Sequence, residues 1–324
     1  MLVVNCLQGR SNFTFFLFFF LFTCLTWSCT TEDTITLSFS EEQSPQGHAI
    51  HKIEFVDDNR AYALGGNLYL FGIAQFSADQ GLTWSIDTIG EKTIRDFDFD
   101  NDKIYSAGYR GYYYSADTIA NIWKVARPGD RRNIHGIVQQ NGIHTTVGGI
   151  SFKNGFIRRL DENLNLVSEL LIEEELSALV KTDDQTLHAV GYGLILRSQD
   201  NGETWLPNGQ EGDNYQDVFF ISNEIGWIVG QAGSILKTTD AGNSWSELRK
   251  PTAHGKDNLL KIHFTDEDRG VVVGEEGIVW YTQDGGDSWA VVDNLPDYDY
   301  TAVYVHDDIA WLGSEQGAIL KVFL

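Results

Sequence analysis

The chain has 324 residues, of which 46 are acidic and 23 are Lys or Arg, so its formal net charge is −23. This charge argues against a nucleic-acid or anionic-lipid surface, because phosphate binding requires clustered Lys and Arg. The length could hold two average domains, but closed all-β architectures often reach it as one domain. We expect an acidic protein that does not bind nucleic acid.

Residues 1–28 are typical of a signal peptide. Arg10 is the one cation of this segment, and the apolar run 13–25 is too short to span a bilayer comfortably. We expect the segment to direct export and then to be removed.

Ser28 directly before Cys29 resembles the bacterial lipoprotein signal, in which that Cys is lipidated and becomes the new N-terminus. The other two cysteines, Cys6 and Cys24, would leave with the signal peptide, so no disulfide could form. We predict a lipid anchor at Cys29 on the periplasmic or outer surface of a bacterial cell envelope, with plain secretion or an uncleaved N-terminal anchor as alternatives.

A glycine that ends an apolar strand recurs at intervals of 39 to 44 residues. The seven positions are Gly65, Gly108, Gly148, Gly191, Gly230, Gly274 and Gly313. Short alternating strands bounded by Gly, Asn and Asp at a period of about 40 residues are typical of propeller blades, because one four-stranded sheet cannot bury its faces alone. We predict an all-β, seven-bladed β-propeller and a monomer.

The predicted propeller covers residues 48–324, after a segment 29–47 that carries the lipid and one strand. The expected repeats are 48–89, 92–128, 133–172, 175–208, 214–250, 258–294 and 298–324. The last repeat supplies only three strands, whereas residues 34–39 form an apolar strand before the first repeat. We predict that this N-terminal strand completes the last blade, so that no sheet edge stays open.

Four repeats share the motif Ser/Thr-x-Asp-x-Gly-x-Ser/Thr-Trp. The Asp and Trp of the four copies are Asp79 and Trp84, Asp200 and Trp205, Asp240 and Trp245, and Asp284 and Trp289. In a hairpin turn such an Asp hydrogen-bonds nearby backbone, the Gly takes a positive φ and the Trp anchors the following strand. We therefore predict a structural role for these carboxylates and expect no catalytic residue, no cofactor and no metal.

This motif is identified as the Asp-box of sialidase-type (BNR) repeats. A longer pattern from Phe220 to Trp245, which includes Gly226-Trp227 and Gly230-x-x-Gly233, resembles the photosystem II stability/assembly factor family. The resemblance implies a helper protein that contacts a partner during assembly or repair of a membrane complex. That family has an arginine-rich surface, and the acidity of this chain departs from it.

Sialidases share the repeat, but their resemblance would require an early Arg-Ile-Pro and three arginines at matching positions, and neither is found. A glycosidase needs two carboxylates at a fixed separation. Because the chain has 46 acidic residues, the sequence neither identifies such a pair nor excludes one. We predict a non-catalytic module that contacts a partner protein. The alternative is a carbohydrate-binding or glycan-processing surface lipoprotein.

Loops on a rigid scaffold usually carry function, and the Asp-boxes occupy one face of a propeller, so we expect the binding face to be the opposite one. The binding candidates on its loops are Tyr109, Arg110, Arg131, Arg132, Tyr192, Gln231, Glu275 and Glu276. Cations are scarce in this chain, so the three arginines are the candidates for meeting a carboxylate or an acidic partner segment. Exposed tyrosines around a central pocket would instead favour a glycan.

Overall fold

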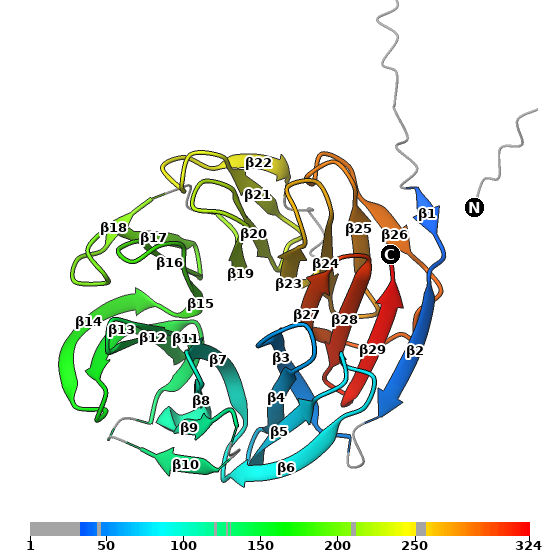
Figure 1. Cartoon of the computed structure of the whole chain (residues 1–324). Coiled ribbons are helices and arrows are strands. Elements are labelled where there is room, and N and C mark those ends of the chain that lie inside the picture. Colours follow the sequence, from blue (N-terminus) through cyan, green and yellow to red (C-terminus); the bar gives the residue numbers. More distant parts are fainter. Residues whose placement is uncertain are drawn as a thin grey trace, which may run out of the picture. The chain divides into compact units, whose positions relative to one another are not determined.

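The computed structural model describes residues 33–43, 47–119, 122–127, 129, 131–208, 212–250 and 257–324. The expected signal peptide and the lipidation site Cys29 lie outside the described residues. Seven sheets are arranged radially around a central axis, and in each the first strand lies innermost (Figure 1). The predicted seven-bladed β-propeller is confirmed.

In every blade the consecutive strands form an antiparallel meander, because they are short and are joined by turns. Blades 1 to 4 consist, from the inside outwards, of β3 (Ala49–Phe55), β4 (Ala61–Asn67), β5 (Phe71–Ser77) and β6 (Ser85–Gly90); β7 (Ile94–Asp100), β8 (Lys103–Gly108), β9 (Tyr113–Asp117) and β10 (Trp123–Ala126); β11 (Asn133–Gln140), β12 (Ile143–Ile150), β13 (Lys153–Asp161) and β14 (Leu166–Glu174); and β15 (Leu176–Lys181), β16 (Leu187–Gly191), β17 (Leu194–Ser198) and β18 (Leu206–Pro207).

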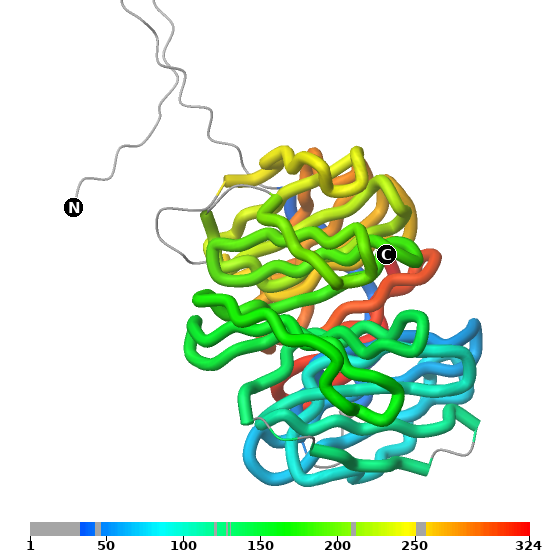
Figure 2. Tube along the Cα trace, turned by 90° about the vertical axis from the view of Figure 1, so that its left-hand side faces the viewer, coloured from blue at the N-terminus to red at the C-terminus, as the bar shows by residue number. Residues whose placement is uncertain are grey.

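Blades 5 to 7 follow the same order. Figure 2 shows the ring of blades from the side. Their strands are β19 (Tyr215–Phe220), β20 (Gly226–Gly230), β21 (Ile235–Thr238) and β22 (Ser246–Arg249); β23 (Leu259–Phe264), β24 (Gly270–Gly274), β25 (Val279–Thr282) and β26 (Ala290–Val292); and β27 (Tyr300–His306), β28 (Ile309–Ser314) and β29 (Ala318–Phe323). A single 3₁₀ turn, η1 (Tyr109–Gly111), is the only helical element within the described residues.

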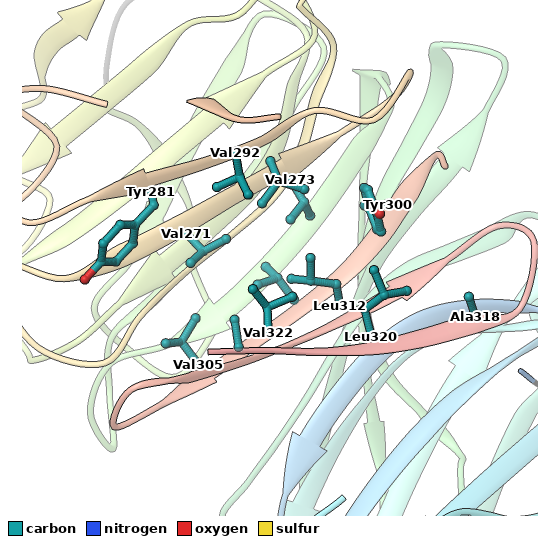
Figure 3. Close-up of a cluster of buried hydrophobic side chains, with 13 residues drawn as sticks. Val271, Val273, Tyr281, Val292, Tyr300, Val305, Leu312, Ala318, Leu320 and Val322 are labelled. Carbon is teal, nitrogen blue, oxygen red and sulfur yellow. The ribbon is translucent and has the colours of Figure 1, made fainter. Parts of the chain in front are cut away.

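The core is divided among the interfaces between blades. One cluster of buried apolar side chains lies between each pair of neighbouring blades, including blades 7 and 1. Figure 3 shows the cluster between blades 6 and 7, where Val271 and Val273 of β24 face Leu312 of β28 and Leu320 of β29. Each blade therefore depends on both neighbours for the burial of its two faces.

The N-terminal segment closes the ring, as predicted, but with a different division of residues. The strand β2 (Ser38–Gln43) pairs antiparallel with β29 as the outermost strand of blade 7. The short strand β1 (Thr34–Ile35) instead pairs in parallel with β26 on blade 6. The expected strand 34–39 is thus split between two blades.

The split occurs at Leu37, whose backbone is held by a side chain rather than by a strand. The Leu37 amide donates to Asn294 Oδ1 at 3.0 Å, and Asn294 Nδ2 donates to the Leu37 carbonyl at 2.8 Å. Ile35 and Leu37, both half-buried, pack against the cluster between blades 6 and 7. The apolar residues Ile35 and Leu37 of the segment 34–39 therefore pack at the interface between blades 6 and 7, and pairing with β29 begins only at Ser38.

The four Asp-boxes have nearly identical hydrogen bonds. In each box the first Ser or Thr hydroxyl donates to the Asp carboxylate at 2.8 Å and accepts the Gly amide at 2.8–3.0 Å. The Ser or Thr before the Trp donates its amide at 2.8–2.9 Å and its hydroxyl at 2.6 Å to the same carboxylate. Each carboxylate thus organises one turn between the third and fourth strands of its blade.

The glycine of the first box shows why the motif requires Gly. Gly81 has φ +70°, and a Cβ at this position would lie 2.3 Å from Nε1 of Trp311 in blade 7. The turn therefore needs both the left-handed conformation and the missing side chain, since it packs directly on the neighbouring blade.

We predict that Trp245→Ala lowers the free energy of unfolding by about 3–5 kcal/mol, because the buried indole, 8% exposed, would leave a cavity between blades 4 and 5. Urea unfolding measures this loss. Leu82→Ala, in an Asp-box turn where the side chain is 55% exposed, is the control and should stay within about 0.5 kcal/mol of the wild type. Equal losses in the two variants would contradict a core role for Trp245.

The first Asp-box also predicts a pH dependence. Hydrogen bonds from the Thr83 hydroxyl and amide and from Ser77 lower the pKa of Asp79 from 3.8 to about 2. Because the folded-state pKa is the lower one, the stabilisation is present above pH 3.8 and is lost as the pH falls towards 2.

We therefore expect Asp79→Asn to lower the thermal unfolding midpoint at neutral pH and to approach the wild type near the lowered pKa of about 2. Asp58→Asn, which changes an exposed carboxylate without a hydrogen bond among the described residues, is the matched control. A difference between Asp79→Asn and wild type that is independent of pH would count against this account.

Candidate functional site

All seven innermost strands carry a β-bulge near their start. At each bulge one residue is left without a partner on the second strand of the blade. The bulge residues are His51, Arg95, His135, Ser177, Gln216, Leu260 and Thr301. A bulge redirects its side chain, and all seven side chains line one cavity of about 230 Å³ at an end of the central channel. We call it the mouth cavity.

The mouth cavity opens on the face that carries the connections between blades and the turns between second and third strands, which we call the loop face. Phe152 and Gln231 reach the cavity from such turns in blades 3 and 5. Glu175 and Asn214 reach it from the connections that precede β15 and β19. The Asp-boxes lie at the opposite strand ends, because antiparallel strands alternate in direction.

Arg95 is the cation of the mouth cavity that has no partner. Its side chain is half-buried and makes no hydrogen bond or ion pair among the described residues. Burial lowers the pKa of Arg95, while the charges of Glu315 and Glu175 oppose this shift. Five guanidinium N–H donors are therefore available to an acceptor in the cavity.

The two histidines of the mouth cavity differ. Burial, followed by the charge of Arg95, lowers the pKa of His51 well below 6.5, so His51 is neutral at neutral pH. Nε2 of His135 lies 2.8 Å from Oε1 of Glu175. Burial raises the pKa of Glu175, but the hydrogen bond and charge of His135 outweigh it, and the net shift is downwards. Glu175 is therefore ionised and bound to His135.

The deeper channel is lined by paired charges. Nζ of Lys52 lies 2.8 Å from Asp96, and Nζ of Lys261 lies 3.0 Å from Asp217. Both carboxylates also accept a backbone amide of the next blade, from Ile137 at 2.8 Å and from Ile262 at 3.1 Å. These carboxylates join neighbouring blades, and their charges are satisfied within the protein.

A third ion pair spans two blade interfaces. Lys181 of blade 4 donates to Asp98 of blade 2 at 2.6 Å, and the same carboxylate accepts the Gln139 amide of blade 3 at 2.7 Å. Further round the ring, Nδ1 of His263 accepts the Val305 amide at 3.2 Å. Burial lowers the pKa of His263 to about 3, which keeps this ring neutral.

Two of the binding candidates lie at the mouth cavity. Gln231 lines it directly and accepts a hydrogen bond from Nδ2 of Asn214 at 2.9 Å. Tyr192, which is 50% exposed, does not line the cavity but packs its ring 5.6 Å from that of Phe152, which does. These contacts connect blades 3, 4 and 5 at the rim.

The other candidates of blades 2 and 6 lie on the loop face outside the cavity lining. The ring of Tyr109 packs against Tyr69 at 5.8 Å, and Arg110 lies over the Tyr109 ring. Glu275 accepts from Nδ2 of Asn258 at 2.6 Å, and exposed Glu276 donates its amide to Asp299.

The three candidate arginines have different environments. Arg132 lies 2.6 Å from Glu169, which also binds Arg158 at 2.6 Å, so its charge is used within blade 3. Arg110 and Arg131 are exposed. Only these two of the three are therefore available to an acidic partner on the surface.

Sequence reasoning missed Arg95 and Phe152 as site residues. The seven bulge residues precede the recurring glycine of their repeats by 12 to 14 residues. An alignment of the seven repeats with one another would therefore have placed them at nearly the same position. The residue at this position of the repeat differs in chemistry from blade to blade, and this variation was a sequence signal for a binding site. Phe152 had no such signal, because its turn in blade 3 lacks the glycine pattern of the other repeats.

The described residues hold no group of three or more His, Cys, Asp or Glu side chains arranged to bind a metal ion. In the same part of the chain no helix has the length and apolar character needed to cross a bilayer.

Two comparisons of sequence point to one family. The family model described as photosynthesis system II assembly factor YCF48 matches residues 208–322. The photosystem II stability/assembly factor HCF136, chloroplastic, of Oryza sativa subsp. japonica is 38% identical over 61 residues. That match covers 17% of this chain and 14% of the curated relative, so the chain aligns with only a small part of the relative's length.

Solved structures support the fold over most of the chain. A structure of YCF48 bound to D1 peptide has a TM-score of 0.70 at 16% identity and covers 91% of this chain and 100% of its own. YCF48 from Cyanidioschyzon merolae has a TM-score of 0.65 at 12% identity, covering 88% of this chain and 98% of its own. U3-55K reaches 0.71 at 9% identity, with coverage of 88% and 98%. The chain is thus a seven-bladed β-propeller that resembles the photosystem II assembly-factor family.

Proposed function

We propose that this protein is a non-catalytic binding and assembly module, a monomer that contacts a partner protein through the loop face opposite the Asp-boxes. The observation that carries the proposal is the mouth cavity, where a half-buried Arg95 without a partner is surrounded by polar side chains. Ligand sites commonly place a few convergent polar groups in a cavity at the mouth of a closed β structure. The resemblance to assembly factors, one of which is bound to a peptide, agrees with a protein partner.

The charges in the channel favour binding over catalysis. Each described channel carboxylate has a basic partner: Asp96 and Glu54 have Lys52, Asp98 has Lys181, Asp217 has Lys261, and Glu175 has His135. A glycosidase would need one carboxylate free to attack or to activate water. These ion pairs instead join strands and blades, and Arg95 remains as a charged group that can bind a ligand.

The aromatic residues favour a protein over a glycan. Phe152 is the one Phe, Tyr or Trp among the described residues that line the mouth cavity, and neither Tyr109 nor Tyr192 lines it. A sugar-binding pocket would present more aromatic surface to the ligand. The single rim aromatic suits an apolar side chain of a polypeptide.

We further propose that the chain is a lipoprotein of the bacterial cell envelope, anchored through Cys29 after removal of residues 1–28. The Asp33 carbonyl accepts the Val291 amide at 2.8 Å on the outer edge of blade 6. Four residues of extended chain span at most about 14 Å, so the anchor would hold blade 6 close to a membrane surface. A partner would then be met at that membrane.

The test is an affinity pull-down of the lipidated protein from its own cells, with Arg110→Glu combined with Arg131→Glu. These exposed residues lie on the loop face, so reversal of both charges should lower recovery of a partner protein about tenfold. Asp287→Lys, an exposed change at the Asp-box of blade 6, is the control and should recover the partner as well as wild type. Recovery of a glycan without a protein, or equal loss in both variants, would contradict the proposal.

A further inference from the structure

Arg95 differs from the other channel cations in lacking an ion-pair partner among the described residues. Lys52, Lys181 and Lys261 each have a carboxylate oxygen within 3.0 Å, whereas no carboxylate oxygen of the described residues lies within 4.0 Å of the Arg95 side chain. Leaving a half-buried guanidinium without an acceptor is costly, and its planar fork matches a carboxylate with two parallel hydrogen bonds. The group that fits Arg95 is therefore a carboxylate supplied by a ligand.

Phe152 lines the same cavity as Arg95 and is held in an unfavourable conformation. Ser151 and Phe152 have φ +56° and +67°, which places a bulky residue in the left-handed region. The Phe152 amide donates to Oε2 of Glu175 at 2.5 Å, and its side chain remains 54% exposed. Strain of this kind is typical of binding sites. Together with Tyr192, Phe152 forms an apolar rim for a ligand side chain.

Three amide side chains supply part of the polar surface of the cavity. Asn214 donates to Gln231, and Gln216 donates to the Asn214 carbonyl, so Oδ1 of Asn214, Nε2 of Gln231 and Oε1 of Gln216 make no hydrogen bond among the described residues. These atoms comprise one donor and two acceptors. A peptide group presents the complementary acceptor and donor.

The volume of the cavity favours a chain end. About 230 Å³ is less than the roughly 300–1,000 Å³ of sites that enclose a drug-sized ligand. The deeper channel below it is lined by the ion pairs of Lys52 and Lys261. A polypeptide terminus can enter along the channel axis with its last residue only.

The surrounding charge selects the kind of terminus. Exposed acidic residues lie on the loop face of blades 6 and 7, namely Glu276, Asp293, Asp297 and Glu315. They repel a segment with several carboxylates and attract one that is neutral or basic apart from its terminal carboxylate. An acidic tail is therefore disfavoured as the occupant.

We infer that the mouth cavity binds the free carboxyl terminus of a partner polypeptide, with the carboxylate on Arg95, the last side chain against Phe152 and Tyr192, and the last peptide group on Asn214, Gln216 and Gln231. This inference rests on the proposed function, which it deepens by naming the part of the partner that enters.

The test uses two degenerate, N-acetylated hexapeptide pools that differ only in a free or an amidated carboxyl terminus, applied to the immobilised full-length protein. Wild type should retain the free-acid pool at least about tenfold better, because the amide cannot form the charge-assisted pair. Arg95→Gln should abolish this preference, and Arg95→Lys should reduce it, since Lys keeps the charge without the fork. Retained peptides should be enriched in an apolar last residue.

Lys103→Gln removes an exposed cation at the start of β8, on the face opposite the loop face, and is the control, with the preference unchanged. Thermal unfolding of each variant checks its fold, and Arg95→Lys decides the outcome if Arg95→Gln does not fold. Equal retention of both pools, no retention of either, or an equal effect of Lys103→Gln would overturn the inference. The inference would also be overturned if wild type retained amidated peptides that contain Asp or Glu and Arg95→Gln did not, because the occupant would then be an acidic side chain.

The two proposals fail separately. A partner protein that is recovered equally by wild type and Arg95→Gln, and lost on reversal of Arg110 and Arg131, would overturn the terminal-carboxylate inference and leave the assembly function supported. Loss of peptide binding in Arg95→Gln without any protein partner in cells would support the pocket and contradict the assembly function.

Discussion

A blade of this protein can bury its two faces only against two neighbouring blades, so the ring has to close for any blade to be stable. The apolar clusters lie between blades, and the one between blades 7 and 1 exists only because the chain returns to its start. The strand Ser38–Gln43 makes this return by pairing with β29. The same requirement explains why carboxylates such as Asp96 and Asp217 accept backbone amides of the next blade.

Closure also creates the site. Seven innermost strands converge on one axis, and a bulge in each turns one side chain into a shared cavity. Because the Asp-box hydrogen bonds organise turns at the other ends of the strands, the turns around the cavity are free of that motif and can vary in sequence. This division separates residues that stabilise the blades from residues that contact a ligand.

The functional argument depends on an imbalance of charge. The chain is strongly acidic, with a formal net charge of −23, yet Arg95, a half-buried cation without an ion-pair partner among the described residues, lies in the mouth cavity. A basic or neutral partner that ends in a carboxylate satisfies both features. The family model matches blades 5 to 7, whereas Arg95 and Phe152 come from blades 2 and 3, so the resemblance supports the architecture and the cavity provides the chemistry.

The sequence by itself determined the number of blades, the strand order and the Asp-box turns, because these depend on a repeat of about 40 residues, on alternation and on local turn chemistry. It also indicated that an N-terminal strand closes the ring. Only the tertiary structure decided which residues do so, since Asn294 holds Leu37 from a segment far along the chain. It likewise decided that Arg132 is bound to Glu169 and that Arg95 has no partner, because these outcomes depend on contacts between strands and blades that no local pattern encodes.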